Sequence, residues 1–352
     1  MKRVWVLVIG VCLAGAWASP SIEGQAAPLL MGSVVPANSL WDKVLKEFGA
    51  SCAKLAQGRV QIRLVPGQGD EENILRKMQV AGQLQAAALT AIGLARVDPA
   101  FNVFGIPLFF ESYAELYHVQ DRLVSTLKGR LEAKGLVFVH WGNAGWVQVF
   151  SRKPVRTIAD LKDLSIFTSA GDDRMVQWYK NHGFRPVPLA VTDITASLQR
   201  GMIDALPVTP LSALFFSWYN STPYMLDLGL APLVGATVIT QKAWGGIADA
   251  DRRAMFQAAE KAEQQLRAEV PKQDQGAVAE MQKRKNLTVT KADLGAGSEW
   301  RAAAEKFATS MRGDLVPADI FDLALKERDA YRQQKGGNAP STTLGTGARW
   351  PQ

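Results

Sequence analysis

The sequence predicts an α/β fold in which helices cover both faces of a largely parallel sheet. Short apolar runs that suit strands alternate with amphipathic runs at helical spacing along most of the chain. The stretch 193–240 shows this alternation most compactly, with a helix, a glycine stop, a strand, a loop, a helix and two strands in succession. A chain of 352 residues is also long enough for two lobes, since one domain takes roughly 150 residues.

Stretch 193–240 is organised around a strand end that would face a crevice. Asp193 can cap the first helix, and Gly201 stands where a helix commonly ends in a left-handed turn. In open α/β sheets ligands bind beyond the carboxyl ends of the strands, and here that edge carries Pro207, Thr209 and Pro210. We therefore expect a ligand cleft at this edge. The expected elements are helix 194–200, strand 202–206, helix 211–219, strand 224–227 and strand 232–240.

The rest of the chain follows the same alternation. Ser112 and Glu115 can cap a long helix. Pro271 is expected to kink or interrupt another helical pattern, which runs from residue 250 to about 285. The expected strands are 31–35, 60–64, 86–91, 136–141, 144–151, 165–168 and 186–189, and the expected helices are 41–55, 74–81, 112–131, 174–181, 250–285, 299–312 and 317–333, with a capped turn at 156–161.

The first residues have the pattern of a secretory signal peptide. Lys2 and Arg3 precede an apolar run, 4–14, which leads to a small-x-small cleavage sequence that ends at Ala18. The alternative is a membrane anchor, but the run falls short of the roughly 20 apolar residues that a span needs. We expect cleavage after Ala18, so that residues 1–18 are the signal peptide and the mature chain is exported and soluble.

The composition is that of an ordinary globular protein. Hydrophobic residues make up 47% of the chain and charged residues 21%. The formal charge is +7, and removal of residues 1–18, which hold two basic residues and no acidic one, leaves 38 − 33 = +5. Because the basic residues are scattered, no nucleic-acid partner is expected. Loss of Cys12 with the signal peptide leaves Cys52 alone, so the mature fold has no internal disulfide.

The sequence offers no set of residues for catalysis or metal binding. His118, His140 and His182 share no metal-ligand spacing, and the chain has no GxSxG elbow, P-loop or GxGxxG fingerprint. The acidic runs at 70–72 and 172–173 begin helices, where carboxylates complement the helix dipole. We therefore expect no catalytic residue, no metal site and no cofactor.

Aromatic side chains near strand ends are candidates for ligand contact. Trp and Tyr present a large apolar surface with one polar tip, which suits an apolar or amphipathic ligand, although core packing is the ordinary role of most such residues. Two polar residues near the same strand ends, Asn38 and Thr209, are candidates as well. The full set of candidates from loops at strand ends is Asn38, Trp41, Trp146, Phe167, Thr209, Trp218 and Tyr219.

Several stretches of the chain, taken in order, resemble a known family. They are GRVQIRLVPGQG at 58–69, FGIPLFFESYAEL at 104–116, RTIADLKDLSIF at 156–167, ITASLQRGMIDA at 194–205 and the long helix from residue 250. This order resembles the TRAP-transporter substrate-binding proteins, the DctP-like periplasmic receptors, over about residues 28–333. The resemblance implies two α/β lobes with crossing strands, a long helix that spans both lobes and hinge closure on the ligand. It also implies a small and a large membrane subunit that take the ligand onward with an ion gradient.

One departure from the family bears on the ligand. The family usually has a Gly-Leu-Lys-Ile-Arg-like strand whose Arg holds the ligand carboxylate by a bidentate pair. The matching run is 163–167, so Phe167 stands in place of that Arg, and a second, less regular Arg falls near Val147. Losing a guanidinium removes about 1.5–3 kcal/mol of charged hydrogen bonding. We therefore expect a hydrophobic or amphipathic ligand; the alternative is that Arg174 or Arg185 has taken over the clamp.

The function predicted on these grounds is that of a monomeric periplasmic receptor which binds a small molecule between its lobes and delivers it to TRAP-type membrane subunits. The alternatives are an acid-binding receptor with a relocated Arg, an exported two-lobed enzyme, and an envelope protein without ligand-driven closure. The expected lobes are 28–147 with 237–285, which includes part of the spanning helix, and 148–236 with 286–335, followed by a disordered tail at 336–352.

Overall fold

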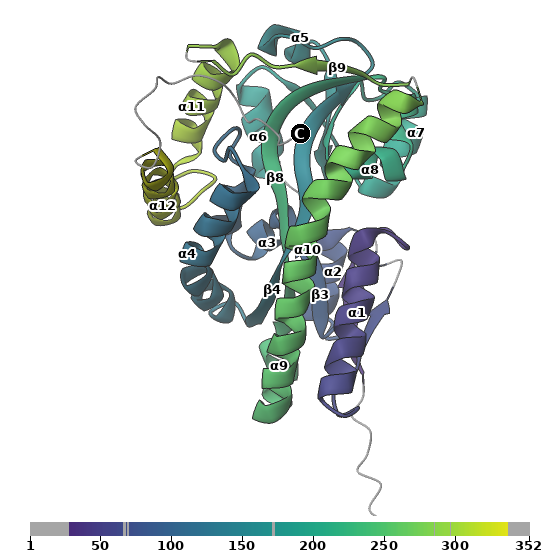
Figure 1. The fold of residues 1–352 in the computed structure, drawn as a ribbon, viewed down its shortest axis with the longest axis vertical. Helices are drawn as coiled ribbons and strands as arrows, with labels where there is room; N and C mark the ends of the chain where they lie inside the picture. The colour runs from purple at the N-terminus through teal and green to yellow at the C-terminus, as the bar shows by residue number, and fades with distance from the viewer. Residues whose placement is uncertain are drawn as a thin grey trace, which may run out of the picture.

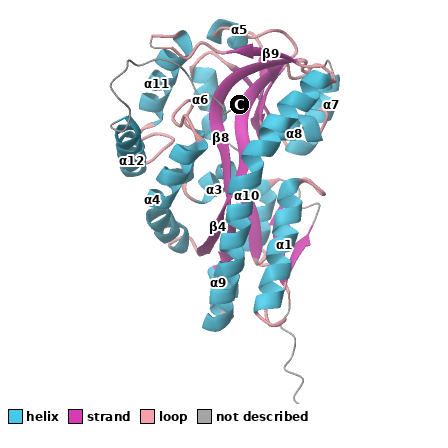
Figure 2. Ribbon diagram, in the orientation of Figure 1, coloured by secondary structure: helices cyan, strands magenta, loops and turns pink. Residues whose placement is uncertain are grey.

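The structure, a computed structural model, describes residues 28–65, 68, 70–170, 173–284, 286–295 and 297–336. The expected signal peptide, 1–18, and residues 337–352 of the expected tail lie outside these residues. The described part is an α/β fold of two lobes, and helices lie on both faces of its curved sheet (Figures 1 and 2). The predicted two-lobed α/β fold class is therefore confirmed, but the sheet is mixed and not largely parallel, since its longest pairing is antiparallel.

The strands of the described residues form one sheet. Their order is β2-β1-β3-β8-β4-β7-β5-β6, and β9 pairs with β8. The strands are β1 (Leu29–Ser33), β2 (Ile62–Val65), β3 (Ala86–Thr90), β4 (Leu136–Ser151), β5 (Ser165–Ser169), β6 (Arg185–Leu189), β7 (Ala205–Val208), β8 (Tyr224–Thr240) and β9 (Thr288–Lys291).

The directions of the strands make the two lobes face each other. β1, β2 and β3 are mutually parallel, and β3 is antiparallel to β8, which is antiparallel to β4. β3 therefore runs in the same direction as β4, from the first lobe toward the second. β7 is antiparallel to β4, and β5 and β6 run parallel to β7. The carboxyl ends of the strands in each lobe thus point toward the other lobe, as a ligand crevice between α/β halves requires.

Strands β4 and β8 run through both lobes without interruption. Next to β3 they pair from Leu136↔Thr240 to Gly142↔Gly235, and next to β7 they pair up to Ser151↔Tyr224. Register shifts mark the crossing, between Asn143 and Trp146 and again between Val147 and Val149. The sequence predicted two separate strands in place of β4 and two in place of β8. Bulges at the crossing bend each of these strands without ending it.

The helices cover the sheet and connect its strands. They are α1 (Leu40–Leu55), α2 (Glu71–Gln79), α3 (Ala91–Val97), α4 (Tyr113–Glu132), α5 (Ile158–Lys162), α6 (Asp173–Asn181), α7 (Ile194–Gln199), α8 (Pro210–Phe215), α9 (Gln241–Gly245), α10 (Asp249–Lys283), α11 (Glu299–Met311) and α12 (Ala318–Gly336), with the 3-10 helices η1 (Pro99–Gly105), η2 (Val191–Asp193) and η3 (Trp218–Asn220).

Helix α10 is the third element that both lobes share. It has 35 residues and packs against α1 and β4 in the first lobe and against α8 in the second. In Figure 1 it is the green helix that runs along the length of the molecule. Pro271 lies inside it and does not end it, although Pro cannot donate to the carbonyl four residues earlier. The predicted spanning helix is therefore present.

The buried apolar residues lie on both faces of the sheet. In the first lobe, η1, α3 and α4 cover one face and α1 with α10 covers the other. In the second lobe, α7 and α8 lie on the face of α10, while α5 and α11 lie on the opposite face. Cys52 is buried between α1 and the sheet, where burial raises the pKa of its thiol to about 12, as suits a small apolar residue.

Some elements differ from those the sequence predicts. The helix expected at 211–219 ends at Phe215, because Ser217 takes a left-handed conformation with φ 57° that a helix cannot include. Pro207, which was expected to follow strand 202–206, lies within β7 opposite Val149. The recorded β5 pairing is with Ala205, so Pro207 needs no N–H toward β5.

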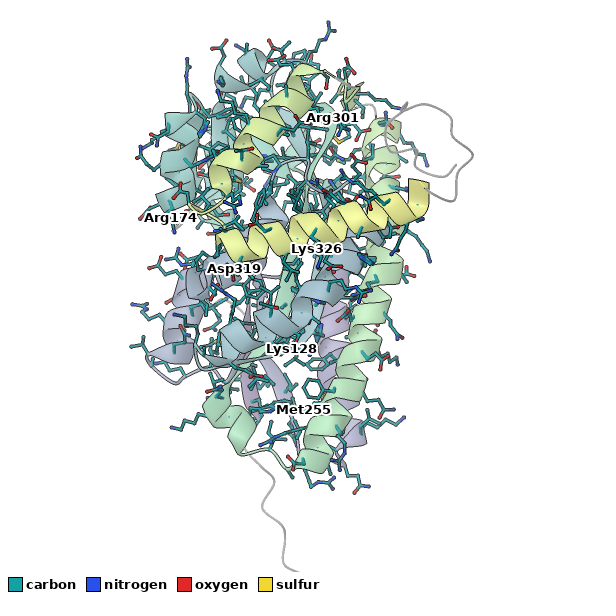
Figure 3. The ribbon with its side chains drawn as sticks, turned by 90° about the vertical axis from the view of Figure 1, so that its left-hand side faces the viewer. Lys128, Arg174, Met255, Arg301, Asp319 and Lys326 are labelled. Carbon is teal, nitrogen blue, oxygen red and sulfur yellow. The ribbon has the colours of Figure 1, made fainter. Side chains whose placement is uncertain are left out.

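Helix α12 lies against the first lobe. It packs against α4 and η1, and Figure 3 shows it across the molecule between α11 and α4. The expected division placed both α11 and α12 with the second lobe, so the limits of the lobes stay a prediction. None of the helices among the described residues is both long and apolar enough to cross a membrane.

Candidate functional site

The lobes meet where β4 crosses from one to the other, and five residues there form what we call the hinge cluster. Trp41 begins α1, Asn143 and Trp146 lie on β4, Leu211 lies in the first turn of α8, and Asp274 lies in α10. Each belongs to an element that ends at, or passes through, the junction. Two of the seven expected site residues, Trp41 and Trp146, belong to this cluster, and a third, Thr209, caps its helix α8.

Trp41 fastens the start of α1 to β4. Its indole N–H donates to the carbonyl oxygen of Asn143 at 3.0 Å, and its side chain is buried. The side-chain amide of Asn143 donates to the phenol oxygen of Tyr117 on α4 at 2.9 Å. Trp41 therefore holds the start of α1 to β4, and Asn143 holds α4 to the same part of β4.

Asp274 fastens α10 to two further elements. Its carboxylate accepts from the backbone N–H of Trp146 at 2.9 Å and from that of Leu211 at 3.1 Å. Gly145 makes this approach possible: its φ is +106°, and an added Cβ would lie 2.9 Å from the carboxylate oxygens. Thr209 completes the start of α8 by accepting from the backbone N–H of Ser212 at 3.3 Å.

The environment of Asp274 favours the protonated acid. The residue is 4% exposed, and burial raises the pKa of its carboxyl to about 7, while the two backbone hydrogen bonds oppose that rise. Burial and then the charge of Asp274 raise the pKa of the Tyr113 phenol. The junction therefore holds a buried acidic group that changes charge near neutral pH.

Two buried polar atoms, one in the hinge cluster and one beside it, have no hydrogen-bond partner among the described residues. They are the indole nitrogen of Trp146 and the phenol oxygen of Tyr113. The two rings pack edge to face, with centroids 5.2 Å apart. Buried donors of this kind are normally paired, so these two atoms are exceptions within the core of the junction.

Asn38 is exposed to solvent, whereas Phe167 is buried. Asn38 lies on the exposed loop between β1 and α1, with φ 66°, and its backbone N–H donates to Asp42 at 2.7 Å. Phe167 is buried in the second lobe, in the apolar cluster that contains Phe150 and Leu206. The structure therefore puts an apolar side chain, with no positive charge, within the lobe core at position 167.

Trp218 and Tyr219 lie in that same apolar cluster, away from the hinge cluster. The indole N–H of Trp218 donates to Thr195 at 3.0 Å. The phenol oxygen of Tyr219 accepts from Arg284 at 3.1 Å. Both polar tips thus have partners inside the second lobe, and ligand contact by these two residues stays a prediction.

Arg174 and Arg185, the alternative carboxylate clamps, have partners at the surface. Arg174 pairs with Asp314 at 2.9 Å, and its side chain is 59% exposed. Arg185 pairs with Asp163 at 3.8 Å and is 65% exposed. In this conformation neither guanidinium is part of the hinge cluster.

The histidines and acidic residues gather into no metal-binding group in the described part of the chain. His140 is buried, its Nδ1 lies 2.8 Å from the carbonyl oxygen of Trp141, and burial lowers its pKa to about 4, so the ring is neutral. No group of three or more His, Cys, Asp or Glu among the described residues is placed to hold a metal ion.

Asp274 was not among the expected site residues, although the sequence carries a signal for it. It follows Pro271 in a polar stretch, which suggests a solvated helix face. Its spacing indicates the opposite, because Leu266, Val270, Asp274, Ala277 and Met281 recur on one stripe, and all five are buried. A charged residue on the apolar stripe of a spanning helix marks a buried polar contact.

Two lobes that share continuous strands and one long helix, with opposed strand ends at a hinge, define a class of ligand-binding receptor. The chain belongs to the DctP family, described as bacterial extracellular solute-binding protein, family 7, which it matches over residues 31–313. The predicted family is therefore confirmed.

Individual relatives and solved structures agree with this assignment. A solute-binding protein of Chromohalobacter salexigens is 24% identical over 230 residues, which are 64% of this chain and 68% of the relative. The 2,3-diketo-L-gulonate-binding periplasmic protein YiaO of Escherichia coli is 26% identical over 225 residues, 62% of this chain and 67% of the relative. A TRAP periplasmic solute-binding protein from Chromohalobacter salexigens with bound D-glucuronate has a TM-score of 0.78 at 21% identity, covering 86% of this chain and 99% of that one. This likeness establishes the fold.

Proposed function

We propose that this chain is the periplasmic receptor of a TRAP-type transporter, which closes its two lobes around a small hydrophobic or amphipathic molecule and delivers it to the small and large membrane subunits. The observation that carries the proposal is the junction itself. The strand ends of both lobes face each other across a hinge formed by β4, β8 and α10. A receptor needs this geometry, and it needs no nucleophile or metal.

The ligand class is inferred from the charges around the junction. Phe167 supplies no positive charge where the family usually has an Arg, and Arg174 and Arg185 pair with surface carboxylates. Asp274 adds a negative charge above about pH 7. Arg267, which lies over the ring of Tyr117, is already paired with Asp121 and Glu263. A ligand carboxylate buried there would therefore lack a free cation, and an unpaired buried charge costs several kcal/mol. A neutral or largely apolar molecule meets no such penalty.

The hinge cluster would keep its geometry while the lobes move. Asp274 holds the start of α8 and the backbone of Trp146 to α10, so these parts turn as one body. Trp41 holds the start of α1, in the first lobe, to Asn143. Closure then brings the starts of α1 and α8, together with the unpaired polar atoms of Trp146 and Tyr113, onto the ligand.

A ligand screen tests the proposal. The mature protein is assayed by thermal shift and native mass spectrometry against dicarboxylates, sugar acids, fatty acids, lysolipids and neutral aromatic compounds. We expect the strongest stabilisation from the apolar and amphipathic compounds. Strong stabilisation by a small dicarboxylate would end the apolar-ligand proposal and leave the receptor role intact.

The competing function is an acid receptor, which the ligands named for the relatives favour: D-glucuronate and 2,3-diketo-L-gulonate are acids. It requires a cation that reaches the ligand after closure. Variants Arg174→Gln and Arg185→Gln separate the two functions. Loss of acid binding in one of them would identify the relocated clamp, whereas unchanged binding of an amphipathic ligand in both agrees with the proposed function.

A further inference from the structure

A cavity lies on the face of the sheet opposite α10, where the two lobes touch. Its volume is about 50 Å³, and almost all of its lining is apolar. The second lobe contributes side chains from α5, α6, α11 and the sheet, and the first lobe contributes the loop after η1. The lining includes Leu108, Ile166, Trp178, Leu230, Trp300 and Ala304. The cavity is separate from the hinge cluster, because none of the five cluster residues lines it.

The polar tips of the two tryptophans in the lining have partners elsewhere. Trp178 donates its indole N–H to Ser310 at 3.2 Å, and Trp300 donates its own to the carbonyl oxygen of Arg156 at 3.0 Å. The two indoles therefore present carbon to the cavity. A cavity without polar groups stays dry and favours an apolar occupant, since a water molecule needs two or more polar partners.

Leu108 covers this cavity from the first lobe in a conformation that leucine rarely adopts. Its φ is 53°, in the left-handed region that favours glycine. Its backbone N–H donates to the carbonyl oxygen of Leu230 on β8 at 2.7 Å, which helps to hold the conformation. Such strain in a branched apolar residue persists only where the surroundings impose it, and it is concentrated at ligand and switch sites.

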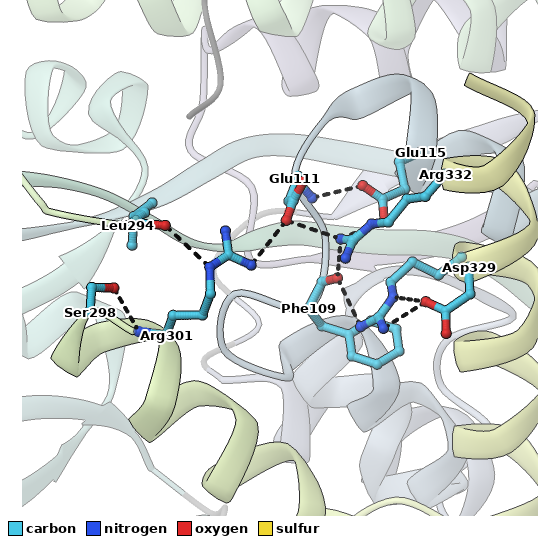
Figure 4. A network of polar contacts seen from close by, with 9 residues as sticks. Phe109, Glu111, Glu115, Leu294, Ser298, Arg301, Asp329 and Arg332 are labelled. Atoms are coloured by element: carbon cyan, nitrogen blue, oxygen red, sulfur yellow. Dashed lines mark hydrogen bonds and ion pairs between the residues drawn. The ribbon is translucent and has the colours of Figure 1, made fainter. Parts of the chain in front are cut away.

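Ion pairs hold the loop that carries Leu108 against the C-terminal helices (Figure 4). Glu111 lies 3.3 Å from Arg301 on α11 and 3.5 Å from Arg332 on α12. The carbonyl oxygen of Phe109 accepts from Arg332 at 3.2 Å and from Arg328 at 3.5 Å. Arg301 follows Trp300 of the lining, so the pair with Glu111 joins the loop that carries Leu108 to the helix that lines the cavity.

We propose that this cavity receives the apolar chain end of a small amphipathic ligand and that Leu108 is its cover. The inference rests on the proposed function, since the chain end belongs to the molecule that the receptor carries. Leu108 belongs to the first lobe and most of the lining to the second, so separation of the lobes uncovers the cavity and closure seals it.

The size of the cavity limits its occupant. An engineered apolar cavity of about 150 Å³ binds benzene, and this one has about a third of that volume. With Leu108 in place it accepts a chain end of a few carbon atoms. A longer chain must displace Leu108, which releases the strained backbone and couples chain length to lobe opening.

Binding of n-alkanols, from n-propanol to n-octanol, tests the site in the full mature chain. Calorimetry and the fluorescence of Trp178 and Trp300 report binding. We expect affinity to rise about fourfold for each methylene until the cavity is full. Ala304→Leu fills the cavity and should weaken n-butanol binding at least tenfold. Ala302→Leu, on the exposed face of the same helix, is the matched control and should leave binding unchanged.

Leu108→Gly keeps the proposal testable if Ala304→Leu does not fold. Glycine accepts a positive φ without strain and removes the cover, so n-octanol should bind more tightly than to the natural chain. Absence of alkanol binding, or equal binding by Ala302→Leu and Ala304→Leu, would overturn the site. Alkanol binding here combined with a ligand screen that yields only acids would support the cavity and contradict the proposed ligand class.

Discussion

Asp274 is the residue on which the geometry of the junction depends most. One carboxylate joins α10, the crossing of β4 and the start of α8 through two backbone N–H groups. A side chain that accepts twice is needed, because each backbone donor left buried without a partner costs about 1–3 kcal/mol. Position 145 must be a glycine, because a Cβ there would lie too close to the carboxylate of Asp274.

The raised pKa of Asp274 makes the stability of the protein depend on pH. The folded value of about 7 lies above the ordinary value of 3.8, so the folded state binds a proton that the unfolded state has lost between these values. The stability contribution is therefore complete below about pH 4 and is lost as the pH rises through about 7. The difference corresponds to roughly 4 kcal/mol. Asp274→Asn cannot titrate and should remove this part of the slope.

Urea unfolding of both proteins at intervals from pH 4 to pH 8 measures the effect. Other buried carboxyl groups titrate in both proteins, so the difference between the two profiles isolates Asp274. The unfolding free energy of the natural chain should fall relative to that of Asp274→Asn as the pH rises. Parallel profiles would mean that Asp274 does not keep its proton on folding.

The residues of the junction were predicted only in part, for physical reasons. Loops at strand ends can be placed from the sequence, so Trp41, Trp146 and Thr209 were among the candidates. Trp218 and Tyr219 were chosen for their amphipathic side chains, and the sequence cannot say that Thr195 and Arg284 satisfy their polar tips. Partners distant in sequence decide whether an aromatic residue faces a core or a ligand.

Among the elements, the crossing strands β4 and β8 show where the backbone itself is closely packed, next to β3 in the first lobe. Gly142 and Gly235 face each other in this ribbon. A Cβ at Gly235 would lie 2.5 Å from the carbonyl oxygen of Leu89 on β3, whereas a Cβ at Gly142 would lie 3.5 Å from its nearest neighbour. Of these two glycines, Gly235 alone has no room for a side chain.

Gly235→Ala should destabilise the protein by about 1–3 kcal/mol, because the new methyl group overlaps a backbone oxygen that cannot move without disturbing β3. Gly142→Ala is the matched control at the paired position. It meets ordinary contacts and should change stability by less than about 1 kcal/mol. Urea midpoints of the two variants measure the difference, and equal losses would contradict the close approach of β3 and β8.

Element type was easier to predict from the sequence than continuity. Apolar periodicity indicated most helices and most strands, although the short helices α3 and α9 were missed, and α10 was expected from its stripe despite Pro271. The bulges that let β4 and β8 cross the junction leave no local signal, so each strand was split in two. The short β9 was missed, because its pairing with β8 comes from distant segments.

At the scale of the whole molecule, the lobes are joined in two ways. Both lobes share β4, β8 and α10, and charged side chains of the two lobes also pair with each other. Glu111, in the first lobe, pairs with Arg301 on α11, and both side chains are more than a third exposed. Exposed ion pairs contribute at most about 1 kcal/mol each. A contact of this size adds little to folding, yet it can shift an equilibrium between open and closed lobes about fivefold.

Glu111→Gln should therefore favour the open form while changing the unfolding free energy by less than about 1 kcal/mol. Small-angle scattering of the ligand-free protein should give a larger radius of gyration for this variant at low salt, with the difference fading at high salt as the pair is screened. Glu132→Gln, an exposed charge change at the end of α4, is the control. Identical scattering of Glu111→Gln and the natural chain would exclude a role for this ion pair in closure.

The central claim is that the receptor selects its ligand by apolar contact and not by negative charge. The most direct measurement is the dissociation constant of one matched pair of ligands, an n-alkanoate and the n-alkanol with the same chain, by calorimetry at neutral pH. The account predicts that the neutral alcohol binds at least as tightly as the carboxylate, because no guanidinium of the hinge cluster meets the charge. A carboxylate that binds a hundredfold more tightly than its alcohol would contradict it.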